Sequence, residues 1–563
     1  MMRTRKQTSL RIFLCVFASF ALHAATEAAN PNKAAIASAH PLATEAGLQI
    51  LKEGGNAFDA AVAVAAALGV VEPTSSGLGG GAFFLLHRAQ DGFETMIDAR
   101  EVAPKAATRD MYLDKDGNPV RGMSMNTALA AGIPGQPAGL AHLAKKYGRL
   151  PLSKSLQPAI KLAEEGFPLY TRLRGAMVAK RAALTASPAA AQVYLRNGEL
   201  PAEGAIIKQP ELANTLRALA AQGADGFYRG AVAQRLVQGV RDLNGIWTLQ
   251  DLAEYRVKER KPLTGKYRGA HIVSAPPPSS GGVALIDALN ILSGFDLHAV
   301  DGGARKHLVI EAMRRVHRDR AQYLGDPDFV SIPIEQLINP YYAAGQRASM
   351  RIDRATPSNA LPGVIESGAP GMQTTHFSVL DAKGNRVAAT MSINFFFGSG
   401  IMIPGVGVLL NNEMDDFSMK PGVPNGFQLV GAAANAIEPG KRPLSSMTPT
   451  FVETQDGVMI LGTPGGSRII GMVLLGVLNW LDGKSAEQVA ASPRYHHQYL
   501  PDFVSYEADA LTADEKAALE QRGHTLREMP QPYGNLQVVT WNKKTGEVQA
   551  ASDPRGVGVG LVY

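Results

Sequence analysis

Hydrophobic positions in the first part of the chain predict two helices followed by a strand. An alanine-rich stretch over Lys33–Gly55 indicates one helix, and the apolar run Asn56–Val71 indicates another. The second run contains Asp59 and is shorter than the roughly 20 residues that cross a bilayer, so it favours a buried core helix. The glycines of Gly77–Gly81 then lead into a predicted strand over Phe83–His87.

The middle of the chain has a mainly helical pattern. Residues 135–260 carry helical periodicity with proline-marked breaks. A turn over Pro276–Gly282 precedes another apolar helix, and Lys306–Tyr323 predicts a charged amphipathic helix.

The pattern changes ahead of Thr374. Residues 355–373 are rich in Pro, Gly, Ala and Ser and predict a linker. Two alternating runs, Thr374–Leu380 and Arg386–Asn394, predict a hairpin, and strands with glycine-rich loops continue to the apolar helix Ile469–Leu481. No repeat of about 20–50 residues is present, which disfavours a solenoid or a propeller.

Composition describes an ordinary globular protein. The 563 residues are 45% hydrophobic and 19% charged, which excludes intrinsic disorder. A single cysteine, Cys15, excludes a disulfide framework and any Cys-ligated zinc or iron–sulfur site. The net charge of +6 raises the question of a nucleic-acid or membrane partner.

The N-terminal 29 residues answer much of that question. Basic residues precede the apolar run Ile12–Leu22, and small residues follow it, which is the layout of a secretory signal peptide cleaved within residues 24–29. The alternative is an uncleaved membrane anchor, although the run is short for a span. Removing residues 1–29 takes away Cys15 and lowers the net charge to +3. The basic residues involved are Arg3, Arg5, Lys6 and Arg11.

Several familiar motifs fail on their context. Gly77–Ala82 matches a permissive dinucleotide fingerprint, but a helix precedes it and a strand follows, the reverse of the required order. Gly483–Ser485 lacks the earlier P-loop glycine, because Leu478 occupies that position. His496 and His497 are adjacent and make a poor metal pair. No nucleophile elbow is present, and the dispersed basic residues make nucleic acid an unlikely partner.

The remaining candidate chemistry lies around Thr374, at the head of a strand. A threonine there is by itself an ordinary strand former. Small and charged groups then follow on predicted loops and strand ends, in Asn411–Asp416, Lys441–Ser446 and Gly465–Ser467. Ser392 and Asn394 are two residues apart, so we expect them on one face of the strand that returns beside Thr374.

Together these segments resemble the γ-glutamyltranspeptidase (γ-glutamyltransferase) family of N-terminal-nucleophile hydrolases. The resemblance rests on several motifs in the same order through nearly the whole chain after residue 29. It implies an α/β fold, a four-layer αββα sandwich formed jointly by two autoprocessed subunits. The motifs are NAFDAAVAVAAAL at 56–68, GLGGG at 77–81, DAREVAP at 98–104, PPPSSGG at 276–282, LGDPDF at 324–329, TTHFSV at 374–379, PLSSM at 443–447 and GTPGGSR at 462–468.

The resemblance further implies that the precursor cuts itself between Gln373 and Thr374. Residues 30–373 would then form a large subunit and residues 374–563 a small subunit. The Thr374 hydroxyl would attack the Gln373 carbonyl, and water would resolve the resulting ester. The freed α-amino group, with an ordinary pKa of about 8, could then act as general base for its own hydroxyl.

The family pattern also assigns substrate-binding roles. Arg100 would grip the α-carboxylate of the substrate, with Ser445 and Ser446 as hydroxyl donors. Without the family pattern, an ion pair of Arg100 with Asp98 or Glu101 is the simpler reading. The α-ammonium would be held by another set of residues, Asn394, Glu413 and Asp416.

Other residues would serve the reacting group itself. Gly465 and Gly466 would offer N–H groups as an oxyanion hole, although a tight turn explains them equally well. Thr375 and Ser392 would orient the Thr374 hydroxyl. Two positions depart from the family pattern: Ser392 is commonly Thr, and Phe427, in the lid segment Pro421–Lys441, stands where some bacterial members have Tyr.

We expect an enzyme that takes a γ-glutamyl group from glutathione or a related amide onto Thr374 and passes it to water or to an amino acid or peptide amine. No metal or organic cofactor is expected, and the partners are small molecules and the two subunits themselves. Two alternatives stay open, a glutaryl- or cephalosporin-type acylase and a non-processing exported binding protein. Export suggests the periplasm, with full secretion as the other destination.

Overall fold

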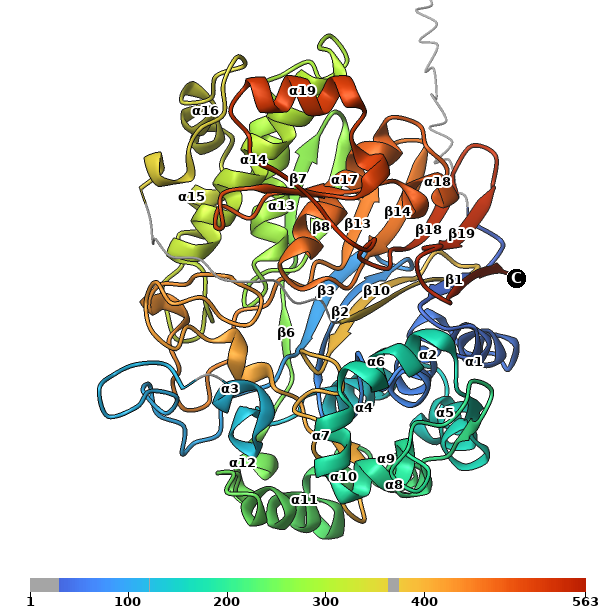
Figure 1. Ribbon diagram of the computed structural model, residues 1–563. Coiled ribbons are helices and arrows are strands. Elements are labelled where there is room, and N and C mark those ends of the chain that lie inside the picture. The colour runs from blue at the N-terminus through green and yellow to red at the C-terminus, as the bar shows by residue number, and fades with distance from the viewer. Residues whose placement is uncertain (1–29, 121, 363–373) are drawn as a thin grey trace, which may run out of the picture.

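Two antiparallel sheets lie face to face, and helices cover the outer face of each (Figure 1). The computed structural model describes residues 30–120, 122–362 and 374–563. The four layers agree with the expected αββα sandwich. The predicted signal peptide, residues 1–29, and the predicted cleavage residue Gln373 lie outside the described residues, as does most of the predicted linker.

The first sheet has seven strands in the order β20-β1-β9-β10-β2-β3-β6. The predicted hairpin is β9 and β10, in which Thr375 lies opposite Met391. On its other side β9 pairs with β1, and β10 pairs with β2, so strands from before and after Thr374 are neighbours in one sheet. The strands are β1 (Ala35–Ser38), β2 (Gly81–Arg88), β3 (Phe93–Ala99), β6 (Lys258–Arg260), β9 (Thr375–Leu380), β10 (Arg386–Ser392) and β20 (Val559–Val562).

The second sheet has six strands in the order β19-β18-β14-β13-β8-β7. It too combines strands from before and after Thr374, because β8 pairs with β13. The strands are β7 (Leu263–Tyr267), β8 (Ala270–Ser274), β13 (Thr450–Glu453), β14 (Gly457–Gly462), β18 (Gln537–Asn542) and β19 (Val548–Ser552).

Helices from residues 41–254 cover the first sheet, and later helices cover the second (Figure 1). The first group is α1 (Pro41–Lys52), α2 (Ala57–Val71), α3 (Met123–Asn126), α4 (Gln136–Tyr147), α5 (Leu152–Glu165), α6 (Thr171–Ala179), α7 (Arg181–Ala186), α8 (Pro188–Tyr194), α9 (Pro210–Gln222), α10 (Asp225–Tyr228), α11 (Gly230–Asp242) and α12 (Leu249–Glu254). The later group is α13 (Gly281–Leu292), α14 (Gly302–Tyr323), α15 (Ile334–Leu337), α16 (Pro340–Ala348), α17 (Ile469–Leu481), α18 (Ala486–Ala491) and α19 (Ala513–Gln521).

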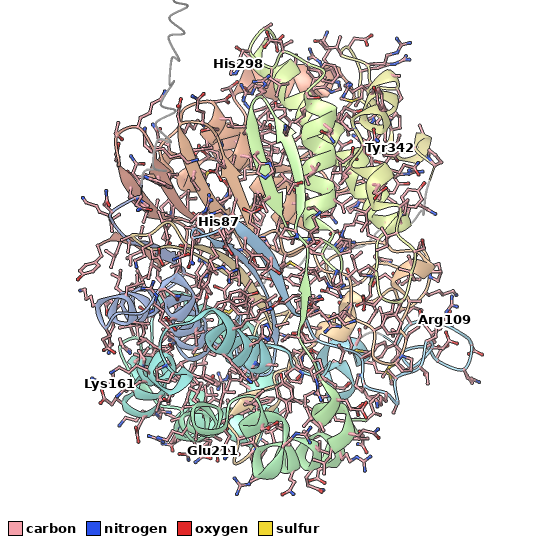
Figure 2. The ribbon with its side chains drawn as sticks, turned by 180° about the vertical axis from the view of Figure 1, so that it is seen from behind. His87, Arg109, Lys161, Glu211, His298 and Tyr342 are labelled. Carbon is pink, nitrogen blue, oxygen red and sulfur yellow. The ribbon has the colours of Figure 1, made fainter. Side chains whose placement is uncertain are left out.

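Figure 2 shows the molecule from the side opposite to that of Figure 1. There Lys161 and Glu211 mark the end occupied by the first helical group, and His298 and Tyr342 mark the other end. None of the helices in the described ranges is long and apolar enough to cross a membrane. The short strands are β4 (Phe167–Pro168), β5 (Ile206–Ile207), β11 (Met402–Ile403), β12 (Val408–Leu409), β15 (Tyr495–His496), β16 (Val504–Tyr506) and β17 (Leu526–Glu528).

The first helical prediction is only partly right. Residues 35–38 form β1 instead of the start of a helix, and α1 begins at Pro41. The strand is selected by tertiary pairing, since β1 bonds to β9 on one side and to β20 on the other. Local alanine content favours a helix but does not override two neighbouring strands. The predicted helix at 56–71 is α2, capped by Asn56 in a reciprocal capping box with Asp59.

The amphipathic prediction for Lys306–Tyr323 is wrong in its burial. The helix α14 is present, but most of its charged side chains are buried. They pair with one another and with the segments packed over them: Glu311 bridges Arg314 and Arg315 and accepts a hydrogen bond from the backbone N–H of Thr356. A charged helix can be buried when its charges are neutralised in this way.

Polar side chains fill part of the space between the two sheets. The His376 ring hydrogen-bonds through Nδ1 to the Thr390 hydroxyl at 2.8 Å and through Nε2 to the Ser378 hydroxyl at 3.3 Å. Ser378 in turn donates to the Gln537 carbonyl of β18 in the opposite sheet at 3.1 Å. Gly462 on β14 lies directly against the ring, so the two sheets meet closely here.

Candidate active site

Thr374 lies immediately before β9 and faces the end of β10. Its side chain is buried, with 6% of its surface exposed. The Thr374 hydroxyl donates to the Ser392 hydroxyl at 3.4 Å, and Ser392 Oγ also accepts from the Asn394 N–H at 2.8 Å. The hairpin register therefore brings Thr374 and Ser392 together at one end of the sheet.

Asn394 is near this site for a different reason from the one predicted. The strand β10 ends at Ser392, and Asn394 follows it with a left-handed backbone, φ 73°. Alternation along a strand therefore does not apply to this pair. The Asn394 side chain instead donates from Nδ2 to the Asn412 carbonyl at 2.9 Å, which fastens the loop after β10 to the segment carrying Glu413.

Thr375 is not brought to the Thr374 hydroxyl. Its side chain shares the face of β9 with Phe377 and Val379, which pack against the helical layer. The Thr375 hydroxyl makes no hydrogen bond to any described residue. Thr375 lies near Glu72 after α2, and burial raises the pKa of that carboxyl.

Arg100 stands at the centre of a buried group of charges. The guanidinium is 1% exposed and contacts Glu101 at 3.5 Å, Glu413 at 2.9 Å and Asp416 at 2.5 Å. Arg100, which was expected to bind the α-carboxylate, thus pairs with Glu413 and Asp416, which were expected to bind the α-ammonium. The alternative prediction of an Arg100–Glu101 ion pair also holds, but the pair is buried.

Three carboxylates sharing one guanidinium cannot all be well stabilised. Desolvation by burial raises the pKa of Glu101 to about 7 and that of Glu413 well above its ordinary value, although Arg100 opposes both shifts. The pKa of Arg100 is raised by Glu413, Glu101 and Asp416 against the opposing effect of burial. The group therefore has more acid than base and favours an added cation.

The two serine loops singled out in the sequence lie against each other. The Ser280 N–H and hydroxyl both donate to the Ser445 carbonyl, at 2.8 and 2.7 Å, and the Ser445 N–H donates to the Pro278 carbonyl at 2.8 Å. The loop at 276–282 therefore holds the loop at 443–447. This arrangement places Ser445 and Ser446 beside Thr374 in a single pocket.

The glycine loop lies at the start of α17. Gly465 and Gly466 have φ of 143° and 56°, conformations that side chains rarely adopt. Neither N–H donates a hydrogen bond to another described residue, and Gly466 lines the pocket with Thr374. N–H groups that make no internal hydrogen bond are suited to binding an oxyanion. The loop is fixed from behind by Ser467, whose hydroxyl donates to Gln498 at 2.7 Å.

Phe427 and Leu429 line the pocket. The Phe427 ring stacks on Phe395 with centroids 4.6 Å apart and planes at 11°. The pocket has a volume of about 20 Å³, which is room for roughly one water molecule. A ligand larger than a water molecule therefore needs side chains of the lining to move.

Most of the predicted site residues converge on this pocket. Thr375, Glu413 and Gly465 are not among the lining residues, although Glu413 contacts Arg100, which is. Reasoning from sequence missed Phe395 beside Asn394 and Arg320 shortly before the LGDPDF motif, and their nearness to those motifs was the available signal. The predicted residues that line the pocket are Arg100, Thr374, Ser392, Asn394, Asp416, Phe427, Ser445, Ser446 and Gly466, and the unpredicted ones are Arg320, Leu429, Met447 and Ile469.

One group of metal-type ligands occurs in the described parts of the chain. Atoms of His307, Glu311 and His524 lie within 4.8 Å of one another. Glu311 is already engaged by Arg314 and Arg315, and these guanidiniums repel a cation. The group is also not among the residues lining the pocket. The arrangement suits a structural polar cluster better than a metal centre.

Comparisons with known proteins agree with this geometry. The chain is 43% identical to the glutathione hydrolase proenzyme of Escherichia coli (strain K12), over 93% of this chain and 90% of that one. It is 42% identical to the protein of the same name from Pseudomonas sp. (strain A14), over 97% of each. Among solved structures, a cephalosporin acylase from Bacillus halodurans superposes with a TM-score of 0.83 at 30% identity, covering 95% of this chain and 96% of that one.

A family match extends over nearly all of the described chain. Residues 43–563 match the family model for γ-glutamyltranspeptidase. That range includes every residue of the pocket, the whole second sheet and all strands of the first sheet except β1. The chain therefore belongs to the γ-glutamyltranspeptidase family.

Proposed function

We propose that this protein is an autoprocessed γ-glutamyl transferase and hydrolase that cleaves glutathione and other γ-glutamyl amides. Thr374 forms a γ-glutamyl ester, which water or the amine of an amino acid or peptide then resolves. Support comes from the family membership, from two relatives named glutathione hydrolase proenzyme, and from the pocket around Thr374.

The precursor first cuts itself ahead of Thr374. The Thr374 hydroxyl attacks the Gln373 carbonyl, the peptide shifts to an ester, and water releases the new N-terminus. In the mature enzyme the α-amino group of Thr374 takes the hydroxyl proton as the oxygen attacks the γ-carbonyl of the donor. Ser392 orients the hydroxyl, and the N–H groups of Gly465 and Gly466 stabilise the oxyanion. The proton then passes to the leaving amine.

The excess of carboxylates around Arg100 is the observation that favours a γ-glutamyl donor over a glutaryl donor. The α-ammonium of a γ-glutamyl group supplies the missing cation beside Glu413 and Asp416, and its charge opposes the rise that burial causes in the pKa of Glu413. A glutaryl or cephalosporin-type side chain lacks that ammonium and would add a carboxylate to an already acidic group. The acylase alternative, which the Bacillus halodurans structure keeps in view, therefore fits this pocket less well.

Two measurements test the proposal. Denaturing gels and intact-mass analysis should give two chains for the wild type, divided ahead of Thr374, and one chain for Thr374→Ala. Release of p-nitroaniline should be faster from γ-glutamyl-p-nitroanilide than from glutaryl-p-nitroanilide. A single intact chain in the wild type would favour the binding-protein alternative, and a preference for the glutaryl donor would favour the acylase.

We also propose that the protein is exported, with the periplasm as its place of action and full secretion as the alternative. The motivation is the charge and hydrophobic pattern of residues 1–29. The same intact-mass experiment tests this proposal, because a mature large subunit should begin within residues 25–30. A large subunit that retains Met1 in cell fractions would contradict export.

A further inference from the structure

Arg320 lines the candidate active site, and neither the motifs nor the family pattern assigned it a role. It lies near the end of α14 and is 5% exposed. It shares the pocket with Thr374, Ser445 and Ser446. Within the described ranges its guanidinium makes one hydrogen bond, from Nε to the Ser280 hydroxyl at 3.1 Å. Four of its five N–H donors are therefore uncommitted.

The arginines of α14 provide an internal comparison. The other four each contact a carboxylate: Arg305 contacts Asp482, Arg314 and Arg315 contact Glu311, and Arg318 contacts Asp319. Arg320 has no carboxylate within ion-pairing distance among the described residues. A buried guanidinium without a direct counter-ion is costly, and here burial lowers the pKa of Arg320 to about 10, with Asp416 partly offsetting and Arg100 adding to the shift. An anion at this place would relieve that cost.

The position of Arg320 points to one particular anion. The Ser280 hydroxyl accepts from the guanidinium and donates to the Ser445 carbonyl, so this hydroxyl links Arg320 to the loop that carries Ser445 and Ser446. Arg100 reaches the beginning of the same loop, because its Nε donates to the Pro443 carbonyl at 3.2 Å. Two guanidiniums therefore flank residues 443–446, but only Arg100 is already occupied by carboxylates.

We propose that Arg320 is a second carboxylate-binding guanidinium of the donor pocket, acting with Arg100, Ser445 and Ser446 on the α-carboxylate of the γ-glutamyl group. The proposal rests on the proposed function. It divides the charges of the donor between two sides of the pocket. The carboxylate lies against Arg320 and the serine hydroxyls. The ammonium lies against Glu413 and Asp416, so that these two carboxylates pair both with the ammonium and with Arg100.

The test compares two donors in wild type and variants. The donors are γ-glutamyl-p-nitroanilide and 4-aminobutyryl-p-nitroanilide, which differ only in the α-carboxylate. Arg320→Gln should lower kcat/KM for the γ-glutamyl donor by about 10- to 100-fold, as expected for loss of a charge-assisted contact, while changing that for the decarboxylated donor by less than about threefold. Arg320→Lys keeps the charge but loses the planar fork, so its selective loss should be smaller.

A matched control is Arg305→Gln on the same helix, where the arginine pairs with Asp482 away from the pocket. This control should leave the ratio of the two kcat/KM values at the wild-type level. Where the decarboxylated donor is turned over too slowly, inhibition constants of L-glutamate and 4-aminobutyrate supply the same ratio. Each variant is first checked for two chains on a denaturing gel and for its thermal midpoint.

Equal losses on both donors, or no loss on either, would overturn the role of Arg320, because a purely structural arginine affects both donors alike. Failure of both the glutamine and the lysine variants to fold would also overturn it. These results differ from failure of the proposed function, in which wild-type protein itself releases no p-nitroaniline from the γ-glutamyl donor.

Discussion

At the scale of single residues, the Ser392 hydroxyl accepts a hydrogen bond from the Thr374 hydroxyl. One oxygen atom accepts from both the Thr374 hydroxyl and the Asn394 N–H. A serine here keeps the hydrogen bond of the more usual threonine, but its side chain is less restricted in rotation. The neighbouring N–H of Asn394 supplies part of the missing restraint, since it fixes where the oxygen lies.

Ser392→Ala should therefore slow both the cut ahead of Thr374 and the hydrolysis of γ-glutamyl-p-nitroanilide. We expect each rate to fall about 2- to 10-fold, the net value of one hydrogen bond. Time-resolved gels and steady-state kinetics measure the two rates. Ser399→Ala is the control, because that buried hydroxyl donates to the Leu410 carbonyl and does not line the pocket. Unchanged rates in Ser392→Ala would remove this residue from the orientation of the nucleophile.

Sequence reasoning predicted residue types better than it predicted residue partners. Arg100, Glu413 and Asp416 were expected near one substrate, and the structure gathers them, but as ion pairs with one another. Partners depend on side-chain reach and burial, which spacing along a chain does not encode. Arg320 was missed for the same reason, since on a helical pattern it resembles the other arginines of α14.

At the scale of elements, Asp415 hydrogen-bonds to the segment that carries Phe427. Its carboxylate accepts from the Ser124 hydroxyl at 2.7 Å and from the Gly426 N–H at 2.8 Å, next to Phe427. Desolvation by burial raises the pKa of Asp415 to about 6, although both hydrogen bonds oppose the shift. A carboxyl group with a pKa raised to about 6 therefore holds the segment that carries Phe427.

This shift predicts a pH dependence of stability. Between about pH 4 and pH 6 the folded protein holds a proton on Asp415 that the unfolded chain has released, so rising pH destabilises the fold through this group. The free energy of unfolding of Asp415→Asn minus that of wild type should increase by up to about 1.4 kcal/mol per pH unit in this window and level off above it. Denaturant titrations at several pH values measure the difference, and a flat difference would contradict the raised pKa.

Element boundaries followed from sequence where local signals were strong. The capping box at Asn56 and Asp59 begins α2, and the apolar run 469–481 coincides with α17. The strand β1 could not be recognised, because four small residues become a strand only by pairing with β9 and β20. Likewise the burial of α14 depends on segments far away in the chain that pack over its charges.

At the scale of the whole molecule, the contact between the sheets leaves no room at Gly462. A Cβ atom there would lie 2.3 Å from Cε1 and 2.4 Å from Nδ1 of His376, and that ring is held by Thr390 and Ser378. Gly462→Ala should therefore force the sheets apart locally and lower the free energy of unfolding by about 1–3 kcal/mol.

Thermal midpoints at one fixed scan rate measure this effect. The control is Gly175→Ala in α6, where a Cβ would meet nothing within 4 Å and alanine is the better helix former. The midpoint should fall for Gly462→Ala and stay level or rise for Gly175→Ala. Equal midpoints for the two variants would show that the sheets can separate at His376 at little cost.

Both sheets combine strands from before and after Thr374, and this has a consequence for assembly. In the first sheet β9 lies between β1 and β10, and in the second β13 lies between β8 and β14. Before a cut ahead of Thr374, folding is a unimolecular event whose rate does not depend on protein concentration. After it, the same sheets must be rebuilt from two chains, so recovery from denaturation becomes a second-order process that dilution slows. Such a cut would make recovery of the fold depend on an encounter between the two chains.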